Sequence, residues 1–121
     1  MKVGNNLMKK LNQFTLFDWN SFQKGKTFVC IGISPWKDFE SGEIIGTKVE
    51  SVIASDETNY NVKDGETVTN LYEKLVFKVN KDIDIPINAV IHPKGVQASV
   101  FGEYRNQLSC TAEDIVIVSK N

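Results

Sequence analysis

The stretch LYEKLVFKVNK, residues 71–81, alternates between apolar and polar side chains, which is the pattern of a β-strand with two different faces. The face that needs a core carries Leu71, Leu75, Phe77 and Val79. The opposite face carries one aromatic ring and two cations, from Tyr72, Lys74 and Lys78. Rings stack on nucleobases and ammonium groups contact phosphates, so the second face has the chemistry to bind a single nucleic-acid strand.

Other aromatic residues also stand beside cations. In GVQASVFGEYRN, residues 95–106, the alternation puts Val96, Ala98 and Val100 on the apolar side, which turns Phe101 outward. An outward Phe next to charged residues needs something to cover it. The candidate nucleic-acid-binding residues are therefore Trp36, Lys37, Lys48, Tyr72, Lys74, Lys78, Phe101, Tyr104 and Arg105. The alternative is that these rings pack under the N-terminal segment or against a second subunit, with lysines that only keep the protein soluble.

Residues that support catalysis are scarce. The single histidine, His92, precedes a proline, and one histidine with two distant cysteines does not match zinc-ligand spacing. Cys30 lies within an apolar strand, where a thiol is protonated and unreactive. The glycines never occur at phosphate-loop or dinucleotide-binding spacing. We expect no catalytic residue, no metal and no cofactor, and hence a binding protein rather than an enzyme.

Length and composition indicate one globular domain over residues 1–121. The chain is 41% hydrophobic and 24% charged, which is enough for one core and too apolar for disorder. Its apolar runs are far shorter than the roughly 20 residues of a membrane span, and the N-terminus has no secretory signal pattern. We therefore expect a cytoplasmic protein without membrane contact, in which Cys30 and Cys110 are buried free thiols.

The net charge of −1 hides an uneven distribution. Residues 1–48 hold seven lysines and four acids, whereas residues 49–121 hold seven cations and eleven acids. An acidic chain still binds phosphates when its cations gather on one surface.

Segments rich in β-branched and aromatic residues predict strands almost throughout. These segments are 26–34, 46–55, 71–81, 87–102 and 108–119. Ser34-Pro35 is expected to end the first strand and Pro93 to bend or interrupt the fourth. Only residues 5–24 show a helical pattern, and it is weak.

Such strands favour an all-β fold, and we predict a small five-stranded Greek-key barrel of the OB-fold type with little helix. Residues 25–119 form the barrel in this prediction, and residues 1–24 form an N-terminal extension. Glycines at the corners are Gly32, Gly46, Gly95 and Gly102. A β-sandwich is the competing architecture.

Residues 87–118, from INAVIHP through GVQASVFGEY to AEDIVIV, resemble small OB-like proteins of Gram-positive conjugative elements. In size and layout, the chain also resembles the single-stranded DNA-binding proteins of lactococcal phages. The resemblance implies an OB-fold, single-strand binding with little sequence preference, and a homodimer or larger homo-oligomer. One departure is the ending IVIVSKN, which lacks the acidic, partner-recruiting tail of cellular bacterial single-strand binders.

Together these observations predict a single-stranded DNA-binding protein of phage or mobile-element replication and recombination, in the cytoplasm of a bacterial host. Its partners would be single-stranded DNA, further copies of itself, and replication or recombination proteins. One alternative is a protein–protein adaptor or virion component that uses the same barrel. Another is an RNA-binding role like that of cold-shock proteins.

Overall fold

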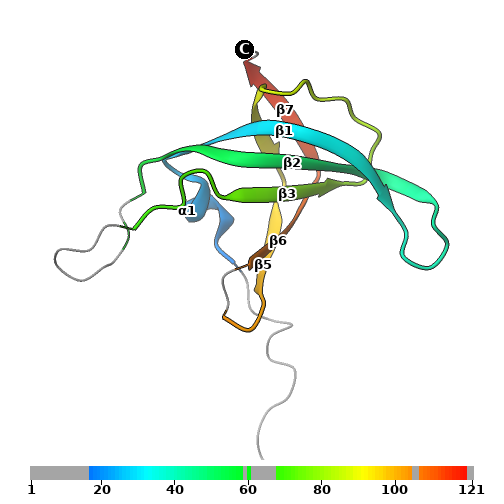
Figure 1. Cartoon of the computed structure of the whole chain (residues 1–121), viewed down its shortest axis with the longest axis horizontal. Helices are drawn as coiled ribbons and strands as arrows, with labels where there is room; N and C mark the ends of the chain where they lie inside the picture. The colour runs from blue at the N-terminus through cyan, green and yellow to red at the C-terminus, as the bar shows by residue number, and fades with distance from the viewer. Residues whose placement is uncertain (1–16, 59, 61–67, 105–106, 120–121) are drawn as a thin grey trace, which may run out of the picture.

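The computed structural model describes residues 17–58, 60, 68–104 and 107–119, and these are mostly β-strand (Figure 1). The elements in chain order are α1 (Trp19–Gln23), β1 (Lys26–Lys37), β2 (Ile44–Asp56), β3 (Lys74–Val79), β4 (Val90–Lys94), β5 (Gln97–Phe101), β6 (Gln107–Ala112) and β7 (Asp114–Ser119). The all-β prediction is confirmed, with seven strand segments where five were expected. Leu7, Met8, Leu11 and Phe14, which carried the weak helical pattern, lie outside the described residues.

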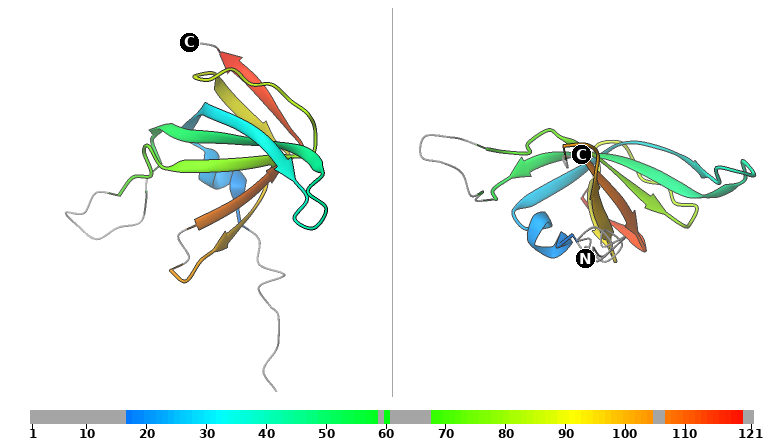
Figure 2. Two further views of the ribbon diagram at one scale, coloured as in Figure 1. Left: turned by 45° about the vertical axis from the view of Figure 1, so that its right-hand side comes forward. Right: turned by 90° about the horizontal axis from the view of Figure 1, so that it is seen from below.

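All seven strands belong to one mixed sheet in the order β5-β6-β3-β2-β1-β4-β7. Neighbouring pairs are antiparallel except β3 and β6, which run parallel from Phe77–Cys110 to Val79–Ala112. Strands β1, β2 and β3 form a curved three-stranded layer, and β5 and β6 run away from it (Figure 2). The sheet therefore wraps around its core instead of lying flat.

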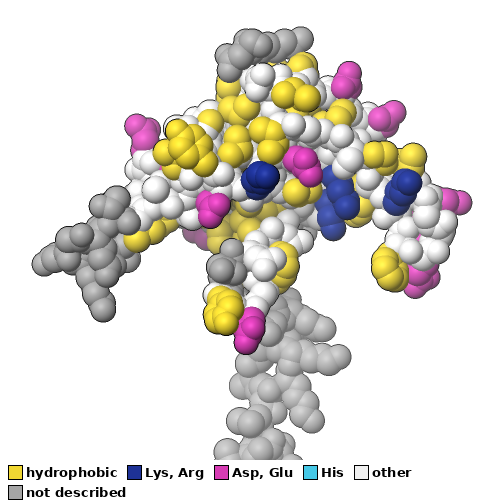
Figure 3. All heavy atoms as spheres, viewed as in Figure 1, with side chains coloured by type: hydrophobic (Ala, Val, Ile, Leu, Met, Phe, Trp, Pro, Cys, Tyr) yellow, Lys and Arg dark blue, Asp and Glu magenta, His cyan; other side chains and the backbone are white. Residues whose placement is uncertain are grey.

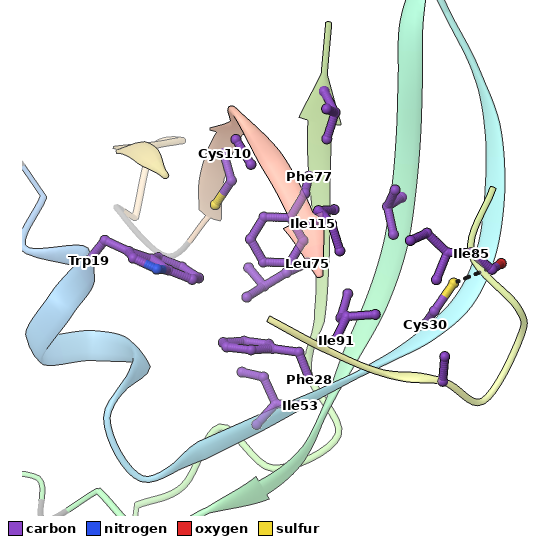
Figure 4. Packing of buried hydrophobic residues seen from close by; sticks show 14 residues of the cluster. Trp19, Phe28, Cys30, Ile53, Leu75, Phe77, Ile85, Ile91, Cys110 and Ile115 are labelled. Carbon is purple, nitrogen blue, oxygen red and sulfur yellow. Dashed lines mark hydrogen bonds between the residues drawn. The ribbon is translucent and has the colours of Figure 1, made fainter. Parts of the chain in front are cut away.

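The core lies on the inner side of the β1–β3 layer. Every second residue of β3 is buried, namely Leu75, Phe77 and Val79, which confirms the predicted alternation within this strand. Trp19 of α1 closes the core, with its ring centroid 5.6 Å from those of both Phe28 and Phe77 (Figure 4). The described part of the predicted N-terminal extension, residues 17–24, therefore contributes to the core.

The beginning of the predicted strand 71–81 is wrong. Strand β3 starts only at Lys74, because Leu71 and Tyr72 form a turn and Tyr72 has a φ of 69°. The backbone N–H of Tyr72 donates to the Ile53 carbonyl at 2.7 Å. A residue in the left-handed region of φ/ψ space interrupts the alternation of a strand. Counting residues back from β3 therefore does not tell to which side of the sheet the Tyr72 side chain points.

The predicted end of the first strand at Ser34-Pro35 is also wrong. Strand β1 continues through Pro35 and Trp36 to Lys37, paired with β2. Its contacts with β4 involve only Phe28 and Val29, so the distal half of β1 has a neighbouring strand on one side only. Proline lacks the N–H that a second neighbour would require, and a strand edge tolerates that loss.

Two short interruptions divide the C-terminal strands. Gly95 and Val96 separate β4 from β5, and Glu113 alone separates β6 from β7. The Glu113 N–H donates to the Lys94 carbonyl at 2.9 Å, so the two interruptions lie side by side. Gly95 has a φ of 62°, and a Cβ at this position would lie 2.5 Å from Cδ of Glu113. The bend therefore requires glycine, as expected for this corner.

A buried ion pair joins the start of β1 to the end of β2. Lys26 Nζ lies 3.4 Å from Asp56 Oδ1, and neither side chain is exposed. Lys26 Nζ also donates to the Phe22 carbonyl and to Thr58 Oγ1, both at 2.8 Å, and lies 4.2 Å from the Phe22 ring centroid. These contacts of Lys26 connect α1, β1 and the segment after β2.

Asp56 organises the connection between β2 and β3. Its carboxylate accepts hydrogen bonds from the Asn70 N–H at 2.8 Å, the Tyr60 hydroxyl at 2.8 Å and the Thr58 N–H at 3.1 Å. Burial alone would raise the pKa of Asp56, but these donors outweigh it and hold the pKa well below its usual range. Asp56 therefore stays charged although its carboxylate is shielded from solvent.

Both cysteines are buried free thiols, as predicted. Burial raises the pKa of Cys30 and raises that of Cys110 to about 12. Cys30 Sγ lies 3.9 Å from the Ile85 carbonyl (Figure 4). Both side chains act as small core residues.

Candidate nucleic-acid interface

Four of the predicted binding residues lie on the outer face of the β1–β3 layer, which we call the lysine face: Trp36, Lys48, Lys74 and Lys78. Lys48 precedes the fully buried Val49, and Lys78 follows the fully buried Phe77. Because side chains alternate along a strand, both lysines point away from the core. Figure 3 looks onto this face and shows lysine side chains over β2 and β3 with an acidic side chain between them. Lys48, Lys74 and Lys78 therefore lie on one surface of the sheet.

Lys48 and Lys78 face each other directly across the β2–β3 pair, and Ser34 of β1 is opposite Lys48 on the other side. Like charges in facing positions destabilise a sheet. Among the described residues, the salt bridges are Lys26–Asp56 and Lys81–Asp114, so neither facing lysine is in one. Two adjacent unpaired ammonium groups offer a site for a phosphate or another anion.

Trp36 lies at the distal end of the lysine face, opposite Gly46 of β2. A Cβ at Gly46 would lie 2.9 Å from Trp36 Cε3 and would also overlap the Val79 carbonyl oxygen. Lys78 Nζ lies 5.8 Å from the Trp36 ring centroid, within the range of a cation–π contact. Glycine at position 46 thus lets the ring lie against the sheet, half-buried and beside a cation.

The lysine face also carries an acid. Glu50 is exposed and lies in register between Gly32 of β1 and Val76 of β3. Lys48 precedes it by two residues on the same side of β2, and Lys74 lies beyond it on β3. The positive surface is therefore divided into a distal part with Trp36, Lys48 and Lys78, and a proximal part with Lys74.

An open groove of about 630 Å³ lies where β3 and β6 diverge, and we call it the β3–β6 groove. Pairing between these strands begins only at Phe77, so residues 74–76 have a neighbouring strand on the β2 side alone. Lys74 and Lys78 border the groove. Its other side chains are mostly apolar, including Phe17, Phe22, Val100, Phe101 and Leu108. The groove thus joins Phe101 to the lysine face.

The structure places Tyr72, Tyr104 and Lys37 apart from this cluster. Tyr72 is 71% exposed but precedes β3 in a turn, and Tyr104 is 79% exposed in the connection between β5 and β6. Lys37 ends β1 beyond an irregularity that follows Trp36. Arg105 lies outside the described residues. Phe101 is 47% exposed and outward, as its strand phase predicts.

Sequence reasoning missed three contributors to the site. Gly46 was assigned to a corner, whereas it provides the space for Trp36. Glu50 alternates in phase with Lys48, so its presence on the lysine face follows from the pattern. Phe22 reaches the groove from α1, and no local pattern pairs a residue of this short helix with β5 and β6.

His92 is exposed on β4 opposite Val116. Within the described ranges, no group of three or more His, Cys, Asp or Glu residues is arranged to hold a metal ion. None of the helices in the described part of the chain has the length and apolar character needed to cross a membrane. Comparison of the chain with protein-family models, curated proteins and solved structures gave no match.

Proposed function

We propose that the protein binds single-stranded DNA on the lysine face without strong sequence preference and without catalysing a reaction. The observation that carries this proposal is the adjacency of a half-buried ring, Trp36, to the facing cations Lys48 and Lys78. A base stacked on a ring contributes roughly 1–3 kcal/mol, and nearby lysines neutralise the flanking phosphates. Neither contact depends on which base is present.

We further propose that the seven segments form the five strands of an OB-type barrel. The two adjacent interruptions make β4–β5 one bent strand and β6–β7 another, which pair as a single hairpin. One end of this hairpin pairs with β1 through β4, and the other pairs with β3 through β6. Counted this way, the hairpin connects both sides of the β1–β3 layer, in the order expected for such a barrel.

The β3–β6 groove supports a single strand over a duplex as the ligand. It is bordered by Lys74 and Lys78 and contains the outward ring of Phe101. Unstacked bases can enter an apolar groove of this kind, whereas the bases of a duplex are stacked inside it. A strand crossing from Trp36 past Lys78 to Phe101 would have both rings and cations along its path.

The biological setting that we propose, phage or mobile-element DNA replication and recombination in a bacterial host, rests on the resemblance of residues 87–118 to the small OB-like proteins. Replication or recombination proteins and further copies of the chain are the proposed partners.

The two tryptophans make fluorescence the first test. Trp19 is 8% exposed, whereas Trp36 is half-buried on the lysine face. Titration with an oligo-dT of about thirty nucleotides should quench Trp36 and leave Trp19 nearly unchanged. The Trp36→Phe variant keeps a ring for stacking and should lose most of the quenching while a gel shift still shows binding. A duplex of equal length is the control ligand.

Salt makes this test decisive. If three phosphates are contacted, affinity should fall about 20-fold between about 50 and 200 mM salt, because neutralised phosphates release their counterions. No quenching and no gel shift at low salt would refute the proposal.

An adaptor or virion component is the second candidate, and one observation favours it. Phe39 at the tip of the β1–β2 hairpin is 100% exposed, which suits a protein contact. Binding of a protein partner through this ring should weaken less steeply with salt than strand binding does, because no phosphate counterions are released. A ribose oligomer that competes equally with oligo-dT would instead favour the RNA-binding alternative.

A further inference from the structure

The β3–β6 groove has the properties of a protein-docking site in addition to its proximity to the lysine face. Its floor is apolar and comes from three separate parts of the chain, represented by Phe22, Val100 and Leu108. Lys74 and Lys78 border the groove together with Glu73, so these three side chains leave one net positive charge there. A ligand that fits must therefore carry a bulky apolar group together with negative charge.

The tip of the β1–β2 hairpin, residues 38–43, has this chemistry. Its sequence DFESGE places a 100% exposed ring, Phe39, between Asp38 and Glu40, with Glu43 close behind. No cation lies within these six residues. The acidic tip is thus complementary in charge to the groove, where two lysines outnumber the single acid Glu73.

Hydrogen bonds hold the backbone of the tip in a defined conformation. The Asp38 carboxylate accepts from the Ser41 N–H at 2.9 Å and from the Glu40 N–H at 3.2 Å. The Asp38 N–H donates to the Glu43 carbonyl at 2.7 Å, and the Gly42 N–H donates to the Asp38 carbonyl at 2.9 Å. An ordered loop loses little conformational entropy on binding, so its exposed Phe can act as an anchor.

The hairpin cannot deliver Phe39 to the groove of its own chain. Strands β1 and β2 remain paired up to Lys37 and Ile44, directly below the tip. Figures 1 and 2 show the tip projecting beyond the rest of the sheet, at the end opposite α1, whose Phe22 contributes to the groove. The complementary tip must come from another molecule.

We propose that the hairpin tip of one copy docks in the β3–β6 groove of a second copy, with Phe39 on the apolar floor and its acids beside Lys74 and Lys78. The two surfaces are different, so the contact is head-to-tail and leaves a free tip and a free groove at the ends of each complex. Copies would therefore add one after another, and the inference does not depend on DNA binding.

The test measures sedimentation of the full chain over a range of concentrations, without nucleic acid. We expect reversible association that weakens at high salt. Phe39→Ser should weaken it at least about 30-fold, the effect of removing an interface anchor. Phe101→Asp should do the same, because it places an acid in the groove facing the acids of the tip. Val118→Ser, on β7 and matched as an exposed apolar residue at 62%, should have no effect.

Mixing the two inactive variants gives the sharpest result. Phe39→Ser retains its groove and Phe101→Asp retains its tip, so an equimolar mixture should form a one-to-one complex that grows no further. Carbodiimide coupling of ¹⁴N and ¹⁵N chains should join Glu40 or Glu43 to Lys74 or Lys78 of the other copy. A monomer at all concentrations would overturn the proposal. So would association that survives Phe39→Ser, because the interface would then lie elsewhere.

Discussion

Lys26 and Lys48 lie on neighbouring strands of the same sheet, yet their surroundings differ in every respect. Lys26 is fully shielded, ion-paired with Asp56 and hydrogen-bonded to two further oxygens. Lys48 is partly exposed and faces a second cation, Lys78, across the strand pair. Lys26 thus stabilises the fold. The position of Lys48 lowers stability, which suggests that this lysine serves to bind a ligand.

The two lysines also differ in what their removal would leave behind. Without Lys26, the Asp56 carboxylate would remain buried with its hydrogen-bond donors but without its cation. Without Lys48, the remaining Lys78 would lose an unfavourable neighbour and stay in contact with solvent and the Trp36 ring. Removing the lysine charge should therefore have opposite effects on the free energy of unfolding in the two regions.

The largest effect is expected at the buried pair. Lys26→Met should lower the free energy of unfolding by about 3–5 kcal/mol, because it leaves a buried carboxylate without its cation. Urea denaturation followed by circular dichroism measures this change. Lys81→Met is the matched control, since Lys81 and Asp114 form an ion pair with side chains about half-exposed, and it should change little.

A double variant distinguishes loss of charge balance from loss of packing. Lys26→Met combined with Asp56→Leu removes both charges and should recover part of the stability lost in the single variant. A double variant less stable than Lys26→Met alone would show that losing the hydrogen bonds of Asp56 costs more stability than removing its unpaired charge restores.

The second effect depends on pH. The pKa of Asp56 is lowered in the folded protein, so the unfolded chain takes up a proton at higher pH than the folded one does. The stabilisation is complete above the ordinary Asp pKa of about 3.9 and is lost as the pH falls below it. Melting temperatures from pH 7 to pH 3 should decline more steeply for the wild type than for Asp56→Asn.

The comparison with Asp56→Asn isolates the contribution of the Asp56 carboxyl group to the pH dependence of stability. Hydrogen bonds donated by Ser21 and Ser41 lower the pKa of Asp18 and Asp38, and a hydrogen bond from Ile115 lowers that of Asp114. These three carboxylates remain in both proteins, so their contribution cancels in the difference. Parallel declines in the two proteins would contradict a role for Asp56 in acid sensitivity.

The sequence predicted the exposed region better than the buried one, for a physical reason. Lys74 and Lys78 alternate with core residues inside one regular strand, so their side is determined by the backbone period. The Lys26–Asp56 pair joins residues thirty positions apart, and the donors around Asp56 come from a polar, turn-rich segment without periodicity. Only the tertiary fold brings these groups together.

The same distinction explains the errors at the candidate site. Tyr72 lies in a left-handed turn that ends the alternation, so extending the strand pattern to it failed. Trp36 was expected in a loop, yet the single-sided pairing of distal β1 carries it past Pro35 onto the lysine face. Neighbouring strands decide both outcomes, and local sequence does not reveal them.

The third effect concerns ligand binding at the exposed region. Lys48→Gln and Lys78→Gln should each weaken oligo-dT binding several-fold and lower the slope of log affinity against log salt by about 0.7, the value for one lost phosphate contact on a single strand. Fluorescence titrations at four salt concentrations give the slope. Lys94→Gln on β4, away from the lysine face, should leave it unchanged. Equal slopes for all variants would show that Lys48 and Lys78 do not contact phosphates of the bound strand.

The smallest effect is a gain in the free energy of unfolding, opposite in sign to the loss expected for Lys26→Met. Lys48→Gln should raise the free energy of unfolding by a few tenths of a kcal/mol, roughly 0.2–0.5, because it removes a like charge from a facing cross-strand pair. The gain should disappear at 1 M salt, where exposed charges are screened within about 3 Å. Lys37→Gln, opposite the uncharged Ile44, should show neither change. If Lys48→Gln instead lowered stability at low salt, attraction to Glu50 two residues along the strand would outweigh the repulsion from Lys78. The lysine face would then be a balanced charge network with no excess cation to offer a phosphate.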